Sequence, residues 1–306
     1  SSKRTLPRWR RDQFRAEQEI GQASAAEGSA GEVVLLVDTF NTCFEPENAR
    51  AALAVLKAAG YQVHCPRPAD QGRPLCCGRT FLNGGMVEQA RVEAQRVIDS
   101  LRDFVEKGVP IVGLEPSCLL TLRDEFPSLM PGPETTALAE RAFLFEEFLA
   151  DELSQGKLNL PLKSLSTNKA LLHGHCHQKA FAAMSSVHKV LALIPELEVN
   201  KIESSCCGMA GAFGYDARYY DVSMKMGEQS LLPAVREADP STLIIADGTS
   251  CRNQIQDGAG REALHVARVL EMAYLTTKCS RSNPSPTYYK QRQTKQYHQP
   301  VSHHRN

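Results

Sequence analysis

Residues 205–215 read Ser-Cys-Cys-Gly-Met-Ala-Gly-Ala-Phe-Gly-Tyr, and the predicted fold is organised around this stretch. A second Cys-Cys-Gly occurs at residues 76–78. Each copy follows a run typical of a β-strand, and the glycine-rich residues after Cys207 are typical of the start of a helix. The repetition predicts a duplicated unit with one Cys-Cys-Gly turn in each half.

Two adjacent cysteines suit metal or redox chemistry better than a disulfide. A bridge between neighbouring residues closes a strained ring far from ordinary disulfide geometry. Two neighbouring thiolates can instead bind one metal centre, because glycine lets the backbone approach closely and amides at a helix start favour anionic sulfur. The other interpretation is a pair of buried thiols that pack as small apolar groups. The second copy in an equivalent place favours the metal or redox role.

Composition limits the class of protein. The chain has 306 residues, of which 42% are hydrophobic, and this predicts about two domains, each with its own core. Its 35 basic and 35 acidic residues cancel, which argues against a nucleic-acid-binding protein. No apolar run approaches the ~20 residues that cross a bilayer, so we expect a soluble intracellular protein. Ten cysteines are too few for a disulfide scaffold and fit a reducing compartment.

The predicted organisation has five parts. Residues 1–32 are expected to be a linker that carries the cluster Arg8-Trp9-Arg10-Arg11, and residues 278–306 a disordered tail because they lack acidic and most apolar residues. Because the chain begins at Ser1 rather than methionine, we expect a processed product or a piece of a longer polypeptide. Between them, residues 33–130 are predicted to be a first unit and residues 169–277 a second unit. Residues 131–168 are predicted to be an inter-repeat helix and linker, with its apolar centre at 142–149.

Strand and helix patterns alternate in both units. In the first, apolar runs predict strands at residues 33–37, 61–65 and 110–114. Three-and-four spacing and stop signals predict helices at residues 46–60 and 86–107. In the second, the same order recurs at residues 170–174, 179–194, 197–202, 219–237, 242–246 and 261–275. Alternation of this kind implies an α/β fold, with parallel sheets flanked by helices in each unit.

The cysteines fall at the ends of the predicted strands. Function in parallel sheets gathers at the carboxyl ends of the strands. Each unit has one cysteine after its first strand, two in the Cys-Cys-Gly turn and one after its third strand. The topology therefore predicts two groups, which are Cys43, Cys76, Cys77 and Cys118, and Cys176, Cys206, Cys207 and Cys251. Cys65 and Cys279 are expected to be bystanders.

Several motifs carry a resemblance to a known family. They are Asp38-Thr39-Phe40-Asn41, Gly113-Leu114-Glu115-Pro116-Ser117-Cys118, His173-Gly174-His175-Cys176-His177, Cys206-Cys207-Gly208-Met209-Ala210-Gly211 and Ala246-Asp247-Gly248-Thr249-Ser250-Cys251-Arg252. Over about residues 33–275 the chain resembles the cysteine-rich CCG-domain family of heterodisulfide reductases and of the iron–sulfur subunits of glycolate and lactate oxidation systems. It most resembles the C-terminal module of bacterial FAD-linked oxidoreductases of the D-lactate dehydrogenase and glycolate oxidase type.

The resemblance implies an electron-transfer role. In that family a flavin domain oxidises a 2-hydroxy acid such as D-lactate or glycolate, and the CCG module passes electrons onward through an iron–sulfur cluster of the 4Fe-4S type. The implied partners are a flavin-bearing dehydrogenase domain or subunit and a downstream acceptor such as a quinone or a cytochrome. The implied location is the cytoplasm, with peripheral attachment to the inner membrane as an option.

The motifs also depart from the family's complete form. The complete motif ends in Cys-x-x-Cys, but Glu115 and Gly248 stand three residues before Cys118 and Cys251. Flavin-linked members carry an aromatic residue in place of Cys43. The resemblance therefore implies a better-supplied second unit and a metal set in which His177 and Cys43 are secondary candidates to Cys76, Cys77, Cys118, Cys176, Cys206, Cys207 and Cys251.

The sequence lacks other cofactor motifs and leaves two further interpretations open. It contains no ferredoxin-type cysteine run and no glycine-rich nucleotide fingerprint, so FAD is expected on a missing domain or a partner. One alternative is thiol–disulfide chemistry, with Cys206 or Cys207 as the attacking thiolate. The other is a non-enzymatic interaction domain stabilised by zinc. Soft thiolates fit an iron–sulfur centre.

Overall fold

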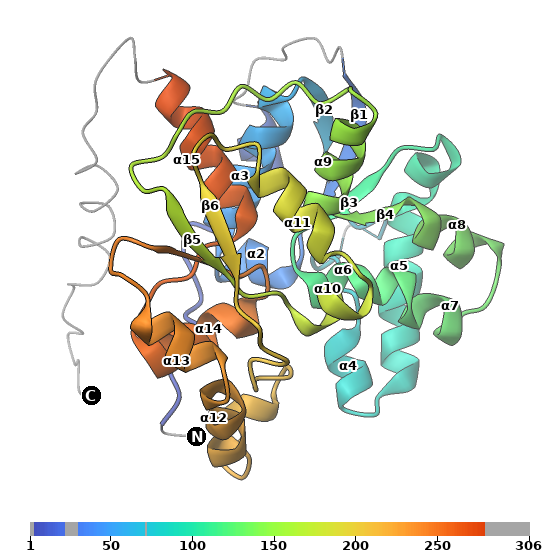
Figure 1. Cartoon of the computed structure of the whole chain (residues 1–306). Coiled ribbons are helices and arrows are strands. Elements are labelled where there is room, and N and C mark those ends of the chain that lie inside the picture. The colour runs from blue at the N-terminus through green and yellow to red at the C-terminus, as the bar shows by residue number, and fades with distance from the viewer. Residues whose placement is uncertain (1–2, 22–29, 71, 279–306) are drawn as a thin grey trace, which may run out of the picture.

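Two parallel β-sheets form the framework of the chain (Figure 1). The computed structural model describes residues 3–21, 30–70 and 72–278. The first sheet has the strand order β2-β1-β3-β4 and the second β6-β5-β7, with parallel pairing throughout. The strands are β1 (Gly31–Leu36), β2 (Tyr61–His64), β3 (Ile111–Gly113), β4 (Ala142–Leu144), β5 (Lys169–Leu172), β6 (Glu198–Lys201) and β7 (Leu243–Ile245). The predicted α/β class is confirmed.

The same topology occurs twice. In each sheet the first strand of the unit is central, and the second and third strands flank it. Val33, Val34 and Leu35 in β1 are completely buried, as expected of a strand that is covered on both faces. The repeated order brings the carboxyl ends of equivalent strands to equivalent places in the two units.

Helices flank both sheets. The long helix α5 (Val87–Glu106) buries Ala90, Ala94, Val97 and Leu101 at three-and-four spacing, as its sequence predicts. The others in the first half are α1 (Ala16–Gly21), α2 (Thr39–Cys43), α3 (Pro46–Ala58), α4 (Arg79–Asn83), α6 (Pro116–Arg123), α7 (Glu125–Leu129), α8 (Pro133–Arg141) and α9 (Phe145–Ser154). Those in the second half are α10 (Cys176–Ala180), α11 (Met184–Leu191), the short 3-10 helix Phe213–Tyr215, α12 (Tyr220–Glu228), α13 (Leu231–Glu237), α14 (Thr249–Ala259) and α15 (Val266–Lys278).

One hydrophobic core joins the two units. A single cluster of buried side chains contains Leu35 from the first sheet, Leu172 from the second, and Leu56 and Leu270 from the helices α3 and α15. These two helices pack against each other in the middle of the molecule (Figure 1). The units predicted at residues 33–130 and 169–277 therefore share a core.

Polar side chains also tie the two units together near the ends of the strands. Arg252 in α14 donates to the Glu45 carboxylate through Nε and Nη2, at 2.8 and 2.5 Å. The backbone N–H of Thr249 donates to Glu115 Oε2 at 2.8 Å. Arg252 is only 5% exposed, and removing one partner of such a pair typically costs about 3–5 kcal/mol. This seam fixes the start of α14 against the first unit.

Several predicted helices differ from the structure. The apolar stretch at 142–149 was expected to be one helix, but it forms the edge strand β4 followed by α9. The helix predicted at 219–237 is divided into α12 and α13. Helix α14 was not predicted, because its polar sequence buries only scattered residues such as Cys251 and Ile255.

The glycine-rich run after Cys207 does not begin a helix. Ala210 and Gly211 have φ angles of 39° and 63°, which are left-handed conformations that interrupt a right-handed helix. The chain then makes the 3-10 turn at Phe213–Tyr215 and becomes α-helical only at α12. The predicted helix start is therefore wrong for this copy, although α4 directly follows Gly78 in the first copy.

The predicted linker at 1–32 contains ordered contacts. Arg4 is 6% exposed and donates to the Gly214 carbonyl at 2.9 Å and to Ser223 Oγ at 2.8 Å. Phe14 is part of the shared core. Residues 3–21 are thus a structural arm that reaches the second unit, which corrects the prediction for this segment. The predicted disordered tail beyond residue 278, with Cys279, lies outside the described residues.

Candidate metal centres

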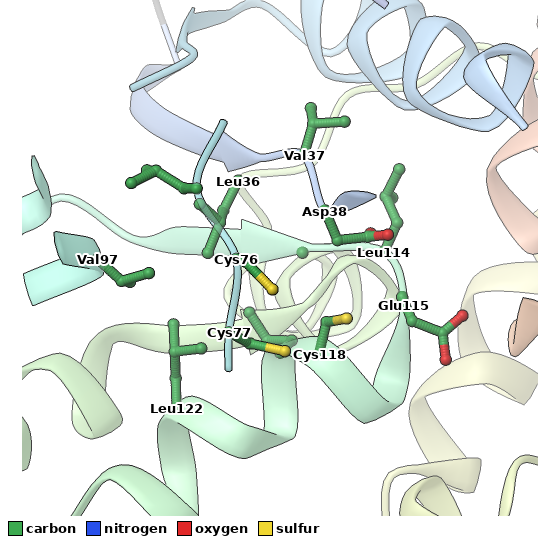
Figure 2. A pocket seen from close by; sticks show the side chains of 13 residues that line it. Leu36, Val37, Asp38, Cys76, Cys77, Val97, Leu114, Glu115, Cys118 and Leu122 are labelled. Carbon is green, nitrogen blue, oxygen red and sulfur yellow. The ribbon is translucent and has the colours of Figure 1, made fainter. Parts of the chain in front are cut away.

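The first cysteine cluster lies beyond the end of β1 (Figure 2). Figure 2 shows the sulfurs of Cys76, Cys77 and Cys118 turned toward one another, with the Asp38 side chain beside them. Cys76 and Cys77 lie in the turn before α4, and Cys118 is in the first turn of α6. The three cysteines line a small cavity of about 20 Å³, which is the space of about one water molecule.

Hydrogen bonding and burial make this first cluster unfavourable for thiolates, and carboxylates add to the effect at Cys118. The pKa of Cys77 is raised by its hydrogen bond to Cys118 and by burial. The pKa of Cys118 rises to about 11: its hydrogen bond with Cys77 opposes the rise, but burial and the nearby Asp38 and Glu115 carboxylates outweigh it. The same burial, together with Glu115, raises the pKa of Asp38 to about 6. Metal would have to displace protons from these thiols.

Cys43 and Cys65 lie apart from this cluster. Cys43 is buried in α2 but does not line the cavity, and its raised pKa follows from burial and the Asp38 carboxylate. Burial raises the pKa of Cys65 to about 12, and this side chain packs against the shared core. The predicted grouping of Cys43 with the other three cysteines is therefore not found.

The second cluster joins four thiols in one network. Cys176 interacts with Cys206, Cys206 with Cys207, and Cys207 with Cys251, and each thiol shifts the pKa of the next. Cys176 begins α10, the adjacent pair lies in the turn after β6, and Cys251 is in the first turn of α14. Cys207 and Cys251 are buried, whereas Cys176 is exposed. All four members of the predicted second group are thus brought together.

Thiolates are favoured at two positions of this network. Hydrogen bonds from Cys176 and Cys207 lower the pKa of Cys206, and the N–H of Gly208 adds a third donor at 3.3 Å. The hydrogen bond from Cys207 likewise lowers the pKa of Cys251, and His173 contributes in the same direction. The pKa values of the donors, Cys176 and Cys207, are raised for the same reason. The alternation gives a donor set that favours the thiolate form at Cys206 and Cys251.

A histidine that the sequence interpretation overlooked completes this cluster. One ring nitrogen of His173 and the sulfurs of Cys207 and Cys251 all lie within 4.8 Å of one another, and all three residues are buried. His173 directly follows β5, although the sequence pattern places it inside that strand. Three histidines alternate with other residues at 173, 175 and 177, and this spacing of two places 173 and 175 on one side of an extended segment. That alternation was the available signal.

At Glu115 and Gly248, where the complete family motif has a cysteine, this chain uses the space for other contacts. A Cβ atom at Gly248 would lie 2.4 Å from His175 Cδ2, so the His175 ring fills the space of a side chain at residue 248. Glu115 caps α6, where its Oε1 accepts from Ser117 Oγ at 2.6 Å, while its other oxygen accepts from Thr249. The space at Gly248 is therefore used for packing, and the Glu115 side chain is used for the seam between the units.

His177, the secondary candidate ligand, faces the seam. Its Nε2 lies 3.2 Å from Arg79 Nη2 in the first unit. Burial, followed by the Arg79 guanidinium, lowers the pKa of His177 to about 4. The ring is neutral at physiological pH, and because a guanidinium can only donate, Nε2 accepts from Arg79 and Nδ1 carries the proton. Neither nitrogen then has a free lone pair, so we assign His177 no ligand role.

Comparison with known proteins agrees with this duplicated arrangement. The model of the CCG cysteine-rich domain matches residues 37–123 and 170–256. The chain belongs to the CCG cysteine-rich domain family. The predicted family is confirmed, and the two matches coincide with the two cysteine clusters, here called the first and second CCG domains.

The relatives include dehydrogenase subunits. One subunit of the anaerobic glycerol-3-phosphate dehydrogenase of Escherichia coli (strain K12) is 29% identical over 241 residues, which are 76% of this chain and 58% of that protein. D-2-hydroxyglutarate dehydrogenase from the same strain is 24% identical over 249 residues, 80% of this chain and 23% of that protein. Lactate utilization protein A 2 of Bacillus cereus (strain Q1) is 25% identical over 251 residues, 78% of this chain and 97% of that protein. The chain thus spans little more than half of the first relative and a quarter of the second.

The donor sets of both CCG domains fit an iron–sulfur group. Three thiols converge in the first and four in the second, and thiolates are the ligands that such clusters take. The second also presents His173, whose buried Nε2 has no hydrogen-bond partner other than the sulfur of Cys251. Among the described residues, no helix has the length and apolar character needed to span a membrane.

Proposed function

We propose that this chain is the iron–sulfur electron-transfer module of an FAD-linked dehydrogenase that oxidises a 2-hydroxy acid such as D-lactate or glycolate. The observation that carries the proposal is the network of four thiols, two of them with lowered pKa values, in the second CCG domain. Two of the relatives, a D-2-hydroxyglutarate dehydrogenase and a lactate utilization protein, support the substrate class. The cofactor would be a 4Fe-4S cluster, which accepts and releases single electrons when bound.

The residues of the second CCG domain would hold this group and shield it. Cys176, Cys206, Cys207 and Cys251 are the proposed ligands, and two of them, Cys207 and Cys251, are at most 5% exposed. Their burial excludes water from one side of the centre, while the exposed Cys176 marks the side open to an electron-transfer partner.

Lys179 would support the charge and the position of the ligands. Its Nζ donates to the carbonyls of Ser204 and Ser205 at 2.5 and 2.9 Å, and so holds the loop that leads into the Cys-Cys-Gly turn. The ammonium also lies close enough to Cys251, Cys176 and Cys206 to interact with their charge. Lys179 thus offsets part of the negative charge of the thiolates.

The flavin would be on a missing domain or a separate partner protein. Oxidation of a 2-hydroxy acid to a 2-oxo acid releases two electrons and two protons, and a flavin is the kind of cofactor that would accept them. This module would receive the electrons one at a time from that partner, and a quinone or a cytochrome is the proposed final acceptor. Peripheral attachment of the assembly at the inner membrane would suit such an acceptor.

Two measurements test the proposal. After anaerobic reconstitution, we expect iron and acid-labile sulfide in the chain, with little zinc. The isolated chain should not turn over D-lactate, glycolate or glycerol 3-phosphate with an artificial electron acceptor, and addition of a flavin-bearing dehydrogenase partner should restore turnover with one of them. Zinc without sulfide would favour the interaction-domain alternative, and turnover by the flavin-free chain would refute the electron-transfer role.

The low pKa of Cys206 favours one second candidate, thiol–disulfide exchange. In this reaction the Cys206 thiolate attacks a substrate disulfide, forms a mixed disulfide and releases one substrate thiolate; Cys207 then displaces the other. Adjacent cysteines form a strained disulfide, which makes this route less favourable. Reduction of a heterodisulfide by the metal-free, prereduced chain would support it.

A further inference from the structure

We propose that His173 is a nitrogen ligand of the metal centre in the second CCG domain, which would then have mixed cysteine and histidine coordination. The inference rests on the proposed function only in taking that centre to be metal-bound. It adds a ligand that neither the cysteine motifs nor the names of the relatives assign.

The first argument is a poorly satisfied buried atom. His173 is 1% exposed, and its Nε2 has no hydrogen-bond partner other than the sulfur of Cys251, whose pKa it lowers. Leaving a buried polar atom without a partner costs about 1–3 kcal/mol, so such an atom in a folded protein calls for a reason. A bound metal ion would satisfy this nitrogen.

The second argument is position. Three separate segments bring His173, Cys207 and Cys251 together, namely the end of β5, the Cys-Cys-Gly turn and the first turn of α14, and the three ligand atoms lie within 4.8 Å of one another. Imidazole nitrogen and thiolate sulfur are compatible ligands for iron.

The third argument is the orientation of the ring. Nδ1 of His173 lies 2.9 Å from Ser204 Oγ, and that hydroxyl is 3.5 Å from the Ile202 carbonyl to which it donates. In the tautomer that carries its proton on Nδ1, this nitrogen donates to the Ser204 hydroxyl and the lone pair of the ring is on Nε2. Metal-bound histidines are typically held by such a hydrogen bond from the second ring nitrogen. Ser204 therefore is a positioning residue for His173.

The neighbouring histidines are committed elsewhere. Nδ1 of His175 accepts from the backbone N–H of His177 at 3.2 Å and so caps α10, and its ring packs over Gly248. His177 contacts Arg79. His177 also has a buried ring nitrogen without a partner, Nδ1, but His173 is the one of the three whose ring nitrogen is grouped with two thiols within 4.8 Å.

A histidine ligand has a functional consequence. A neutral imidazole in place of a thiolate makes the centre less negative, and clusters with histidine ligands have higher reduction potentials than all-cysteine clusters. The second CCG domain would thus accept electrons from a reduced flavin more readily than an all-thiolate centre would.

The decisive experiment is pulsed EPR on the reduced, iron-reconstituted full chain, with natural-abundance and ¹⁵N-histidine protein compared. We expect strong ¹⁴N couplings that become ¹⁵N couplings on labelling. They should disappear in His173→Cys, whose reduction potential should also fall, and persist in His177→Ala and in His188→Ala, a control on α11. The wild-type measurement needs no variant, so misfolding of His173→Cys does not affect it.

The outcomes separate this inference from the proposed function. Iron and sulfide without a histidine coupling would overturn the role of His173 and leave the iron–sulfur assignment intact. If no cluster forms, Co²⁺ titration of the metal-free chain tests the ligand directly through sulfur-to-cobalt absorption bands. His173→Ala should then weaken Co²⁺ binding at least about tenfold relative to wild type and His188→Ala. Equal affinities, or no Co²⁺ binding at all, would overturn the inference.

Discussion

The two Cys-Cys-Gly turns have nearly the same backbone but different surroundings. Gly78 and Gly208 have φ angles of 77° and 90°, and each donates its N–H to the sulfur two residues earlier, at 3.5 and 3.3 Å. Only glycine adopts this conformation without strain, so the turn itself requires the third residue of the motif. The duplication has kept the geometry that exposes two adjacent sulfurs to one centre.

The residues around the two turns differ, and so do the pKa shifts of the sulfurs. Asp38 and Glu115 stand beside the first cluster, whereas His173 and His175 stand beside the second. The equivalent residues Cys76 and Cys206 respond in opposite directions: the pKa of Cys76 is raised, chiefly through its hydrogen bond to Cys77, and that of Cys206 is lowered. The comparison teaches that the motif fixes where sulfur lies, while neighbouring residues decide whether it is anionic and ready to bind metal.

The largest expected effect is on iron content. Cys207 hydrogen-bonds both Cys206 and Cys251, so Cys207→Ser removes the middle of the second donor set. We expect this variant to lose most of its iron after anaerobic reconstitution, and the matched variant Cys77→Ser to keep most of it. Colorimetric iron analysis per folded chain measures the difference. The reverse ranking would assign the main centre to the first CCG domain.

The next expected effect is on the alkylation of the metal-free chain. At pH 6 an ordinary thiol with a pKa of about 8.5 is only ~0.3% thiolate. The raised pKa of Cys76 leaves even less, whereas the lowered pKa of Cys206 keeps it anionic as the pH falls through this range. Both side chains are partly buried, so access is comparable.

Iodoacetamide at pH 6 should therefore modify Cys206 at least about tenfold faster than Cys76, even though a low pKa reduces intrinsic nucleophilicity. Mass spectrometry of tryptic peptides over time gives both rates in one sample. The ratio should shrink as the pH rises toward the pKa of Cys76. Equal rates at pH 6 would show that the two turns do not differ in charge state.

A smaller effect is expected on stability at the incomplete end of the second motif. In Gly248→Ala the new Cβ meets His175 Cδ2 at 2.4 Å, and such overpacking costs about 1–3 kcal/mol. Gly132→Ala is the control, because a Cβ there meets nothing within 4 Å and the backbone is extended, with φ of 169°. Urea denaturation gives both free energies of unfolding.

A second change separates the clash from other effects at residue 248. In a His175→Ala background the ring is gone, so the penalty of Gly248→Ala should fall by more than half if the clash is its cause. An undiminished penalty would mean that the place of the absent cysteine is closed by something other than His175.

The sequence predicts those features of the two CCG domains that depend on local residue patterns. Buried strands such as residues 33–37, the amphipathic helix α5 and the repeated Cys-Cys-Gly turn follow from apolar periodicity and glycine. Because parallel strands bring their carboxyl ends to one edge, the grouping of Cys176 with the Cys206–Cys207 pair and Cys251 was also predictable.

The parts that escaped prediction depend on contacts between distant segments. The role of His173 requires Ser204 and the turn at 206–208, and the role of Glu115 requires Thr249 from the other unit. Strand β4 forms because β3 offers it an edge, which overrides the helical pattern of residues 142–149. The grouping of Cys43 with the other cysteines was predicted from its place after the first strand. Cys43 does follow that strand, but it is part of α2 and does not line the cavity.

The smallest expected effect is that of Cys43→Ala on metal binding. Cys43 is 6% exposed, so removal of its sulfur should cost about 1 kcal/mol of stability through lost packing. Metal binding should not change, because Cys76, Cys77 and Cys118 supply the first cluster without it. To isolate that cluster, Co²⁺ titrations are made in a Cys207→Ser background, with Cys118→Ala as the positive control. Cys118→Ala should abolish most of the residual sulfur-to-cobalt absorption, and Cys43→Ala should leave it at the level of the background. A loss as large as that of Cys118→Ala would make Cys43 a fourth ligand, and the first CCG domain would then match the second in the number of its sulfurs.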